Sequence, residues 1–123
     1  MSHAEEMLAL HLRTTGHAFT REYRFAAEAT GGTGKGCRQR MVATGLKDWR
    51  FDFAIPTRKF AVEVEGGAWT NGRHTRGQGF YADLLKYEAA QRLGWTVYRC
   101  DPAMIRSGRA LQTITMLLGQ RDE

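Results

Sequence analysis

Residues 50–67 read RFDFAIPTRKFAVEVEGG, and the other elements of the chain are predicted to be arranged around this stretch. It contains two runs, Phe51–Ile55 and Phe60–Glu65, in which aromatic or β-branched residues recur at every second position. A short Pro-Thr-Arg-Lys connection joins the two runs. Period-two patterning interrupted by a turn is typical of a β-hairpin. The stretch therefore predicts two antiparallel strands.

Successive side chains on a strand point to opposite faces of the sheet. The hairpin pattern thus predicts one apolar face, made of Phe51, Phe53, Ile55, Phe60, Val62 and Val64. The other face would carry the carboxylates of Asp52, Glu63 and Glu65. If the connection pairs Ile55 with Phe60, Asp52 lies opposite Glu63, with Cβ atoms roughly 4.5–5.5 Å apart. Like charges at that separation are destabilising, so this cluster needs either water around it or a cation within it.

The composition is that of an ordinary globular protein. The chain has 123 residues, 42% of them hydrophobic and 25% charged, which predicts one domain over residues 1–123. It lacks the run of about 20 apolar residues that a membrane helix needs. It also has no apolar N-terminal run of the signal-peptide type, so we expect a cytoplasmic protein. The two cysteines, Cys37 and Cys100, are too few for a disulfide framework or a four-ligand zinc site.

The net charge of +5 suits a polyanionic partner, and nucleic acid is the commonest one. Basic residues concentrate in 35–50 and 73–76, whereas several acids lie in the hairpin. An acidic pocket within a basic surface is what metal-dependent chemistry on phosphate requires. The candidate DNA-contacting residues are Lys35, Arg38, Arg40, Arg73 and Arg76. The alternative for each is an ordinary solvated side chain.

The remaining segments predict helices and strands around the hairpin. Ser2 and Glu5 match a capping box that opens a helix over 2–13, and Gly16 is a plausible stop. The patterns further predict a strand at 19–25, a glycine-rich loop at 30–36, a short helix within 37–47, a helix at 80–93, a strand at 95–100, and a helical tail from 104 to 118. An antiparallel hairpin followed by a helix and a further strand predicts a mixed α/β (α+β) domain. Its central mixed sheet would be flanked by helices.

Hard cations such as Mg²⁺ take oxygen ligands, commonly one or two carboxylates together with waters and substrate phosphate. Asp52 with Glu63 or Glu65 meets that requirement, and such an ion would polarise a phosphodiester. Lys86 and His74 are the nearest candidates by topology for a positive group beside it. The alternative for the acids is a solvent-exposed sheet face with cross-strand arginines as partners, and for Glu65 alone this alternative is favoured.

Two further candidates have simpler explanations. Glu6 lies near the edge of the buried face of the first helix, and on the spacing alone a solvated surface glutamate is the favoured alternative. His74 lies between Arg73 and Arg76 in a polar stretch that reads as a long loop after the acidic strand. Loops held on a rigid scaffold commonly carry function, but a lone histidine is more often a surface residue.

The stretch from RFDFAIP through VEVEGGAW to LLKYEAAQRLGWTVYRC resembles the PD-(D/E)xK nuclease superfamily. Over roughly residues 48–106 it is similar to the branch that contains very-short-patch-repair endonucleases and small phage endonucleases. The resemblance implies a restriction-endonuclease-like fold, with Asp52 as a metal ligand and Glu63 at the family's D/E position. Glu65 stands where many members have lysine, which is a departure from the pattern. Lys86 would then supply the missing positive charge.

The same resemblance implies that Glu6 is the helix-borne acid of the site and that His74 follows the Gly-aromatic segment as histidines do in the repair enzymes. The expected function is a Mg²⁺-dependent DNA endonuclease, with Mn²⁺ as a substitute, acting on branched, recombination or repair DNA in a bacterium or a phage-infected host. A homodimer would suit cutting of both strands. The alternative is a non-catalytic nucleic-acid-binding module of the same fold, which the missing lysine at position 65 favours. An RNA-directed nuclease is a third, weaker interpretation.

Overall fold

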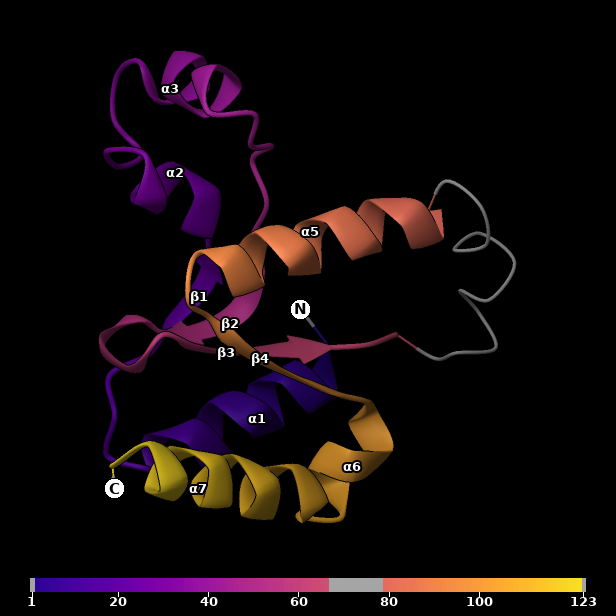
Figure 1. Ribbon diagram of the computed structural model, residues 1–123. Coiled ribbons are helices and arrows are strands. Elements are labelled where there is room, and N and C mark those ends of the chain that lie inside the picture. The colour runs from indigo at the N-terminus through magenta and orange to yellow at the C-terminus, as the bar shows by residue number, and fades with distance from the viewer. Residues whose placement is uncertain (1, 67–78, 123) are drawn as a thin grey trace.

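The computed structural model describes residues 2–66 and 79–122 (Figure 1). Its elements follow the chain in the order α1 (His3–Arg13), β1 (Thr20–Tyr23), α2 (Phe25–Ala29), α3 (Cys37–Ala43), β2 (Phe51–Ile55), the 3₁₀ turn η1 (Pro56–Arg58), β3 (Phe60–Val64), α5 (Phe80–Arg92), β4 (Thr96–Cys100), α6 (Pro102–Arg106) and α7 (Arg109–Asp122). No helix in these residues is both long and apolar enough to cross a membrane.

The sheet has four strands in the order β1-β2-β3-β4. The β1–β2 and β2–β3 pairs are antiparallel, and β3–β4 is parallel. Ile55 pairs with Phe60, which confirms the predicted hairpin and its register. The parallel fourth strand follows α5, which makes the sheet mixed and confirms the predicted α+β class.

Helices cover both faces of this sheet (Figure 1). On one face α1, α6 and α7 pack on Phe53, Ile55, Phe60 and Val62 in a core that includes Leu8, Leu12, Ile105 and Ile114. On the other face α5 and α2 pack on a second core, made of Phe25, Phe51, Ala54, Ala61, Ala89, Ala90 and Trp95. The structure thus has three layers, with the sheet in the middle.

The predicted single apolar face of the hairpin is wrong at Phe51. Phe53 and Ile55 belong to the α1–α6–α7 core, but Phe51 belongs to the opposite core. Its ring stacks on Phe25 with centroids 4.1 Å apart and lies 5.0 Å from the ring of Trp95. Tertiary contacts with these two aromatic residues therefore override the alternation where β2 begins.

The ends of the first elements agree with their local sequence, with one exception. Ser2 caps α1, because its Oγ accepts a hydrogen bond from the Glu5 N–H at 3.1 Å, and Gly16 has the left-handed φ of 79° that a chain reversal requires. The strand predicted for 19–25 is shorter, since β1 ends at Tyr23 and Phe25 already begins α2. Burial of the Phe25 ring against Phe51 ends the extended segment there.

Candidate metal-binding and catalytic site

The regular β2–β3 ladder ends at the pair Phe53–Val62, and the next residue of each strand is acidic. The backbone N–H of Asp52 donates to Glu63 Oε2 at 2.8 Å, and the N–H of Val64 donates to Asp52 Oδ2 at 2.7 Å. Each carboxylate thus accepts a hydrogen bond from the backbone of the opposite strand. This reciprocal arrangement fixes both acids on the sheet at the point where the strands separate.

Glu63 is a charged side chain in the protein interior, with only 5% of its surface exposed. Its Oε1 contacts Lys86 Nζ from α5 and accepts a hydrogen bond from the Tyr87 hydroxyl at 3.2 Å. Burial of an unpaired carboxylate is costly, so these donors are needed to keep Glu63 inside. The structure brings together two of the residues that the sequence singled out, Glu63 and Lys86.

Asp52 is half-buried next to this pair. Burial and the negative charge of Glu63 raise the pKa of Asp52 to about 6. The nearby charge of Glu5 acts in the same direction, whereas the hydrogen bond from Val64 N–H opposes it. A carboxyl group that is costly to ionise without a cation is the kind of group that a divalent ion would stabilise in its charged form.

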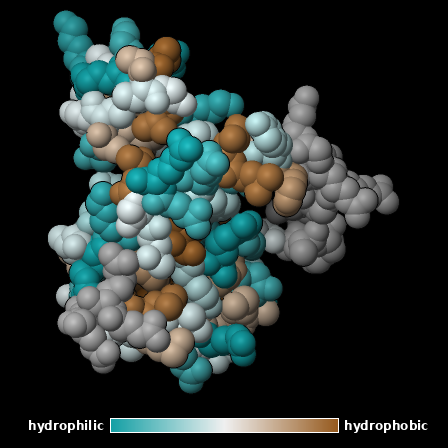
Figure 2. Space-filling model, in the orientation of Figure 1, coloured by the Kyte–Doolittle hydropathy of each residue, from teal (hydrophilic) through white to brown (hydrophobic). Residues whose placement is uncertain are grey.

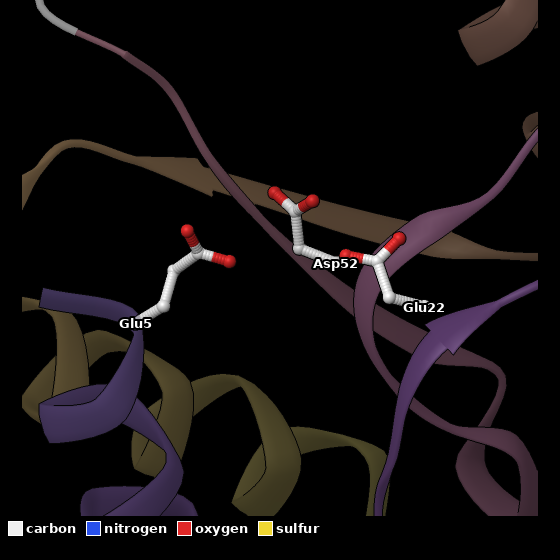
Figure 3. Close-up of side chains that lie close together, drawn as sticks. All are labelled: Glu5, Glu22 and Asp52. Atoms are coloured by element: carbon white, nitrogen blue, oxygen red, sulfur yellow. The ribbon is translucent and has the colours of Figure 1, made fainter. Parts of the chain in front are cut away.

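Two more carboxylates approach Asp52 from other elements, Glu5 from the first turn of α1 and Glu22 from β1 (Figure 3). Each of the three residues offers an oxygen, and these oxygens lie within 4.8 Å of one another. Glu22 has a φ of 51°, a conformation that is uncommon for residues other than glycine. The donor set is all oxygen, which fits a hard cation such as Mg²⁺ or Mn²⁺.

Glu65, the third acid of the hairpin, lies in a different environment. Its Oε1 accepts a hydrogen bond from Arg99 Nε at 2.6 Å, and both side chains are more than 40% exposed. Arg99 comes from β4, the strand next to β3, and its guanidinium lies 4.5 Å from the centre of the Tyr87 ring. The alternative stated for Glu65 was an exposed side chain paired with an arginine on the neighbouring strand, and Arg99 is such a partner.

Glu6 points to a separate ion pair. Its Oε2 accepts a hydrogen bond from Arg21 Nη1 at 2.8 Å, and this contact lowers the pKa of Glu6 below its usual value. The acid of α1 that reaches Asp52 is therefore Glu5, the residue that the sequence assigned to the capping box. Three of the predicted site residues, Arg73, His74 and Arg76, lie outside the described residues.

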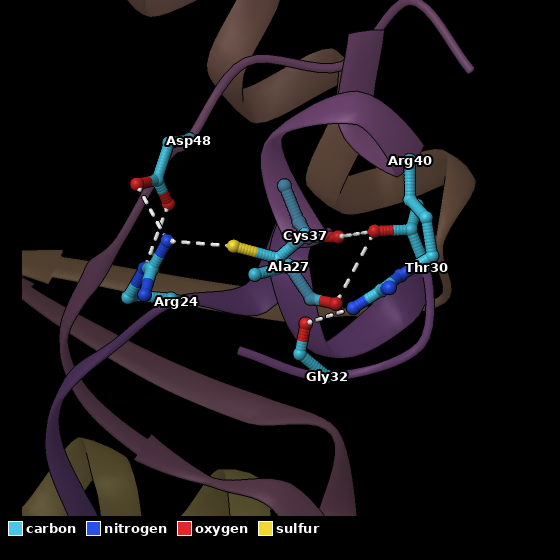
Figure 4. A network of polar contacts seen from close by, with 8 residues as sticks. Arg24, Ala27, Thr30, Gly32, Cys37, Arg40 and Asp48 are labelled. Carbon is cyan, nitrogen blue, oxygen red and sulfur yellow. Dashed lines mark hydrogen bonds and ion pairs between the residues drawn. The ribbon is translucent and has the colours of Figure 1, made fainter. Parts of the chain in front are cut away.

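The remaining basic candidates lie between β1 and β2. Lys35 and Arg38 are exposed, whereas Arg40 donates to the carbonyl oxygens of Lys35 at 2.9 Å and Gly32 at 3.1 Å. Figure 4 shows the Arg40 guanidinium turned toward the Gly32 carbonyl. Arg40 thus holds the glycine-rich loop in shape.

Comparison with known proteins finds no match: no family model, no curated protein and no solved structure matches this chain.

Four residues of the site were not singled out as such by the sequence: Glu5, Glu22, Tyr87 and Arg99. Tyr87 follows Lys86 directly, so its presence near Glu63 could have been inferred once Lys86 was placed there. Glu22 carried a weaker signal, since it lies in the predicted strand at 19–25, whose place beside β2 was not predicted. Its partnership with Asp52 depends on the β1–β2 register, which no short-range pattern encodes.

The three carboxylates around Asp52 lead to a testable prediction on metal affinity. Glu5→Gln and Glu22→Gln should each weaken Mn²⁺ binding about tenfold or more, because each removes one anionic oxygen from the cluster. Glu6→Gln is the matched control, since it alters the neighbouring residue of α1 but removes an ion pair with Arg21 instead. Calorimetric titration with Mn²⁺ measures the three dissociation constants. Equal affinity in all three variants would remove Glu5 and Glu22 from the site.

Proposed function

We propose that this protein is a Mg²⁺-dependent DNA endonuclease, with Mn²⁺ as an alternative ion. The observation that carries the proposal is the position of the Asp52 carboxylate. Asp52 lies next to the buried Glu63–Lys86 pair and within reach of Glu5 and Glu22. Several carboxylates that could share one cation, with a lysine next to them, form an arrangement suited to phosphodiester hydrolysis.

In this proposal Asp52, Glu5 and Glu22 hold the cation. When bound, the cation would polarise the phosphodiester and lower the pKa of a water molecule. Glu63 accepts a hydrogen bond from the Asp52 N–H and thereby holds Asp52 in place. Tyr87 and Lys86, which donate to the other oxygen of Glu63, hold Glu63 itself. Glu65, which is paired with Arg99, has a supporting role at the edge of the site.

Lys86 is the proposed electrostatic group. Its Nζ contacts a Glu63 oxygen, and it is anchored on a helix over the sheet. A fixed positive charge at this place would stabilise the negative charge that develops on the phosphate during hydrolysis. It would thereby replace the lysine that stands at the position of Glu65 in the families that this chain resembles.

The rival proposal is a module of the same fold that binds nucleic acid without cutting it. The two are separated by incubating the protein with supercoiled plasmid, a four-way DNA junction and a matched RNA, each with Mg²⁺, Mn²⁺ or EDTA. The endonuclease is expected to cut DNA with either ion and not with EDTA. The rival is expected to retard the DNA in a gel and leave it intact under all three conditions, and cutting of RNA alone would indicate an RNA-directed enzyme.

A further inference from the structure

The chain between β1 and β2, residues 24–50, forms a projecting unit that we call the arm. It contains α2, the glycine-rich loop and α3, and it extends from the sheet on the side of α5 (Figure 1). Tyr23 pairs with Phe51 where the arm leaves and rejoins the sheet. The adjacent residues of these strands, Glu22 and Asp52, are members of the acidic cluster. The arm therefore begins and ends at the candidate site.

The arm is firmly attached and has its own small core. Arg24 and Asp48, near its two ends, are joined by hydrogen bonds of 3.0 and 2.9 Å (Figure 4). The Phe25 ring stacks on Phe51 of the sheet, while Ala26, Ala27 and Met41 form a buried cluster within the arm. These contacts hold the arm in one position relative to the site.

The glycine-rich loop at the outer part of the arm also has a fixed shape, which Arg40 maintains. The Arg40 guanidinium occupies the inside of the loop, and a Cβ at Gly31 would lie 2.8 Å from Arg40 Nε. Gly31 has a φ of 119°, a backbone conformation that residues other than glycine rarely adopt. The loop thus combines a defined backbone shape with an exposed lysine, Lys35.

Most of the protein's excess positive charge lies on the arm. Its 27 residues include six basic and two acidic side chains, so the arm accounts for +4 of the total net charge of +5. Arg24 and Arg40 are engaged within the arm. The other four basic residues, Lys35, Arg38, Lys47 and Arg50, are exposed, and within the described part of the chain none of their side chains makes a hydrogen bond or close ion pair. Figure 2 shows mostly hydrophilic residues at the outer end of the arm.

We propose that the arm binds the phosphate backbone of the nucleic acid on one side of the bond that is cut. This inference rests on the proposed function, because it takes the substrate of the adjacent site to be DNA. A fixed array of exposed cations suits a regularly spaced polyanion, and such contacts position the substrate without reading its sequence. Lys35 and Arg38 make these contacts, and Arg40 shapes the loop that presents Lys35.

The test compares two double variants that lower the net charge equally. Lys35→Gln/Arg38→Gln changes the arm, and Arg13→Gln/Arg109→Gln changes exposed residues of α1 and α7, on the opposite face of the sheet. Binding of a fluorescent duplex is measured in EDTA over a range of salt concentrations, and cleavage by wild type with Mg²⁺ is measured in parallel. The arm variant should bind about tenfold more weakly and have a salt slope reduced by roughly 1.8, since each lost phosphate contact reduces it by about 0.9. The control should retain the wild-type slope.

The possible failures are distinct. Equal binding by the two double variants, with cleavage by wild type, would overturn the arm proposal and leave the endonuclease standing. Neither binding nor cleavage of DNA by wild type would overturn both proposals. Competition by polyglutamate as strong as that by unlabelled duplex would overturn the assignment to nucleic acid and indicate an acidic protein partner.

Discussion

Asp52→Asn is expected to abolish Mg²⁺-dependent DNA cleavage and to make the folded protein more stable at pH 7. Asparagine can still accept the hydrogen bond from Val64 N–H, so the strand geometry is retained. The loss of the charged oxygen should reduce the rate of cleavage by about 10³-fold or more, which corresponds to roughly 4 kcal/mol. The stability gain follows from removing a charge that is crowded by Glu63 and Glu5.

The pH dependence of this gain has a defined sign. The pKa of Asp52 is about 6 in the folded protein, above the ordinary value of about 3.9 in the unfolded chain. The folded state therefore binds the proton more tightly, and the wild type loses stability as the pH rises from about 4 to about 6. The difference in melting temperature between Asp52→Asn and wild type should grow over this interval and then level off. Added Mg²⁺ should raise the melting temperature of the wild type only, because ligands stabilise the state that binds them.

Asp48→Asn is the matched control. Hydrogen bonds from Arg24 lower the pKa of Asp48, which is the opposite shift. The same substitution there should reduce stability near neutral pH, and this effect should persist down to about pH 4, because the folded-state pKa of Asp48 lies below its ordinary value of about 3.9. Thermal unfolding of the three proteins between pH 4 and pH 8 measures both signs. An Asp52→Asn protein that is less stable than wild type at pH 7 would contradict the crowding of charge around Asp52.

Lys86→Gln is expected to impair both cleavage and stability. It removes the positive partner of Glu63, whose side chain is only 6% exposed. Breaking a buried ion pair from one side is strongly destabilising, and the partial exposure of Lys86 reduces the expected cost to about 1–3 kcal/mol. Cleavage should fall about 10²–10³-fold, because the fixed positive charge beside the phosphate is lost.

A double variant separates the two effects. Glu63→Gln/Lys86→Gln leaves no unpaired charge, so it should be more stable than Lys86→Gln alone while cleavage stays low. Lys59→Gln is the control for loss of a lysine, since Lys59 is exposed and donates to the Leu93 carbonyl at the turn end of the hairpin, whereas Asp52 and Glu63 lie at the other end of the β2–β3 ladder. Denaturant unfolding and plasmid cleavage provide the two readouts. Lys86→Gln with wild-type cleavage would exclude the electrostatic role of this residue.

The hairpin and its register were predictable from sequence because their causes are local. Alternation at period two and the length of the connection determine that Ile55 meets Phe60 and that Asp52 and Glu63 face each other. The cap at Ser2 is local in the same sense. Lys86 was expected near the hairpin carboxylates by topology, but its contact with Glu63 in particular was not predicted.

The rest of the site depends on contacts between elements distant in the sequence. The face of Phe51 is set by Phe25 and Trp95, and no pattern within the strand indicates it. The choice between Glu5 and Glu6 depends on how α1 is rotated over the sheet. The two acids are consecutive residues of the helix, but Glu5 lies next to Asp52 whereas Glu6 pairs with Arg21. A resemblance can indicate that such an acid exists, but only the packing of α1 identifies which one it is.

Cleavage of supercoiled plasmid by wild type and by Asp52→Asn, side by side over a titration of Mg²⁺, tests the endonuclease proposal most directly. Wild type should produce nicked and linear products that increase with Mg²⁺ and disappear in EDTA, and a folded Asp52→Asn protein should produce neither. Intact plasmid with wild type at every Mg²⁺ concentration, together with salt-sensitive binding of the same DNA, would contradict the endonuclease and leave a nucleic-acid-binding module.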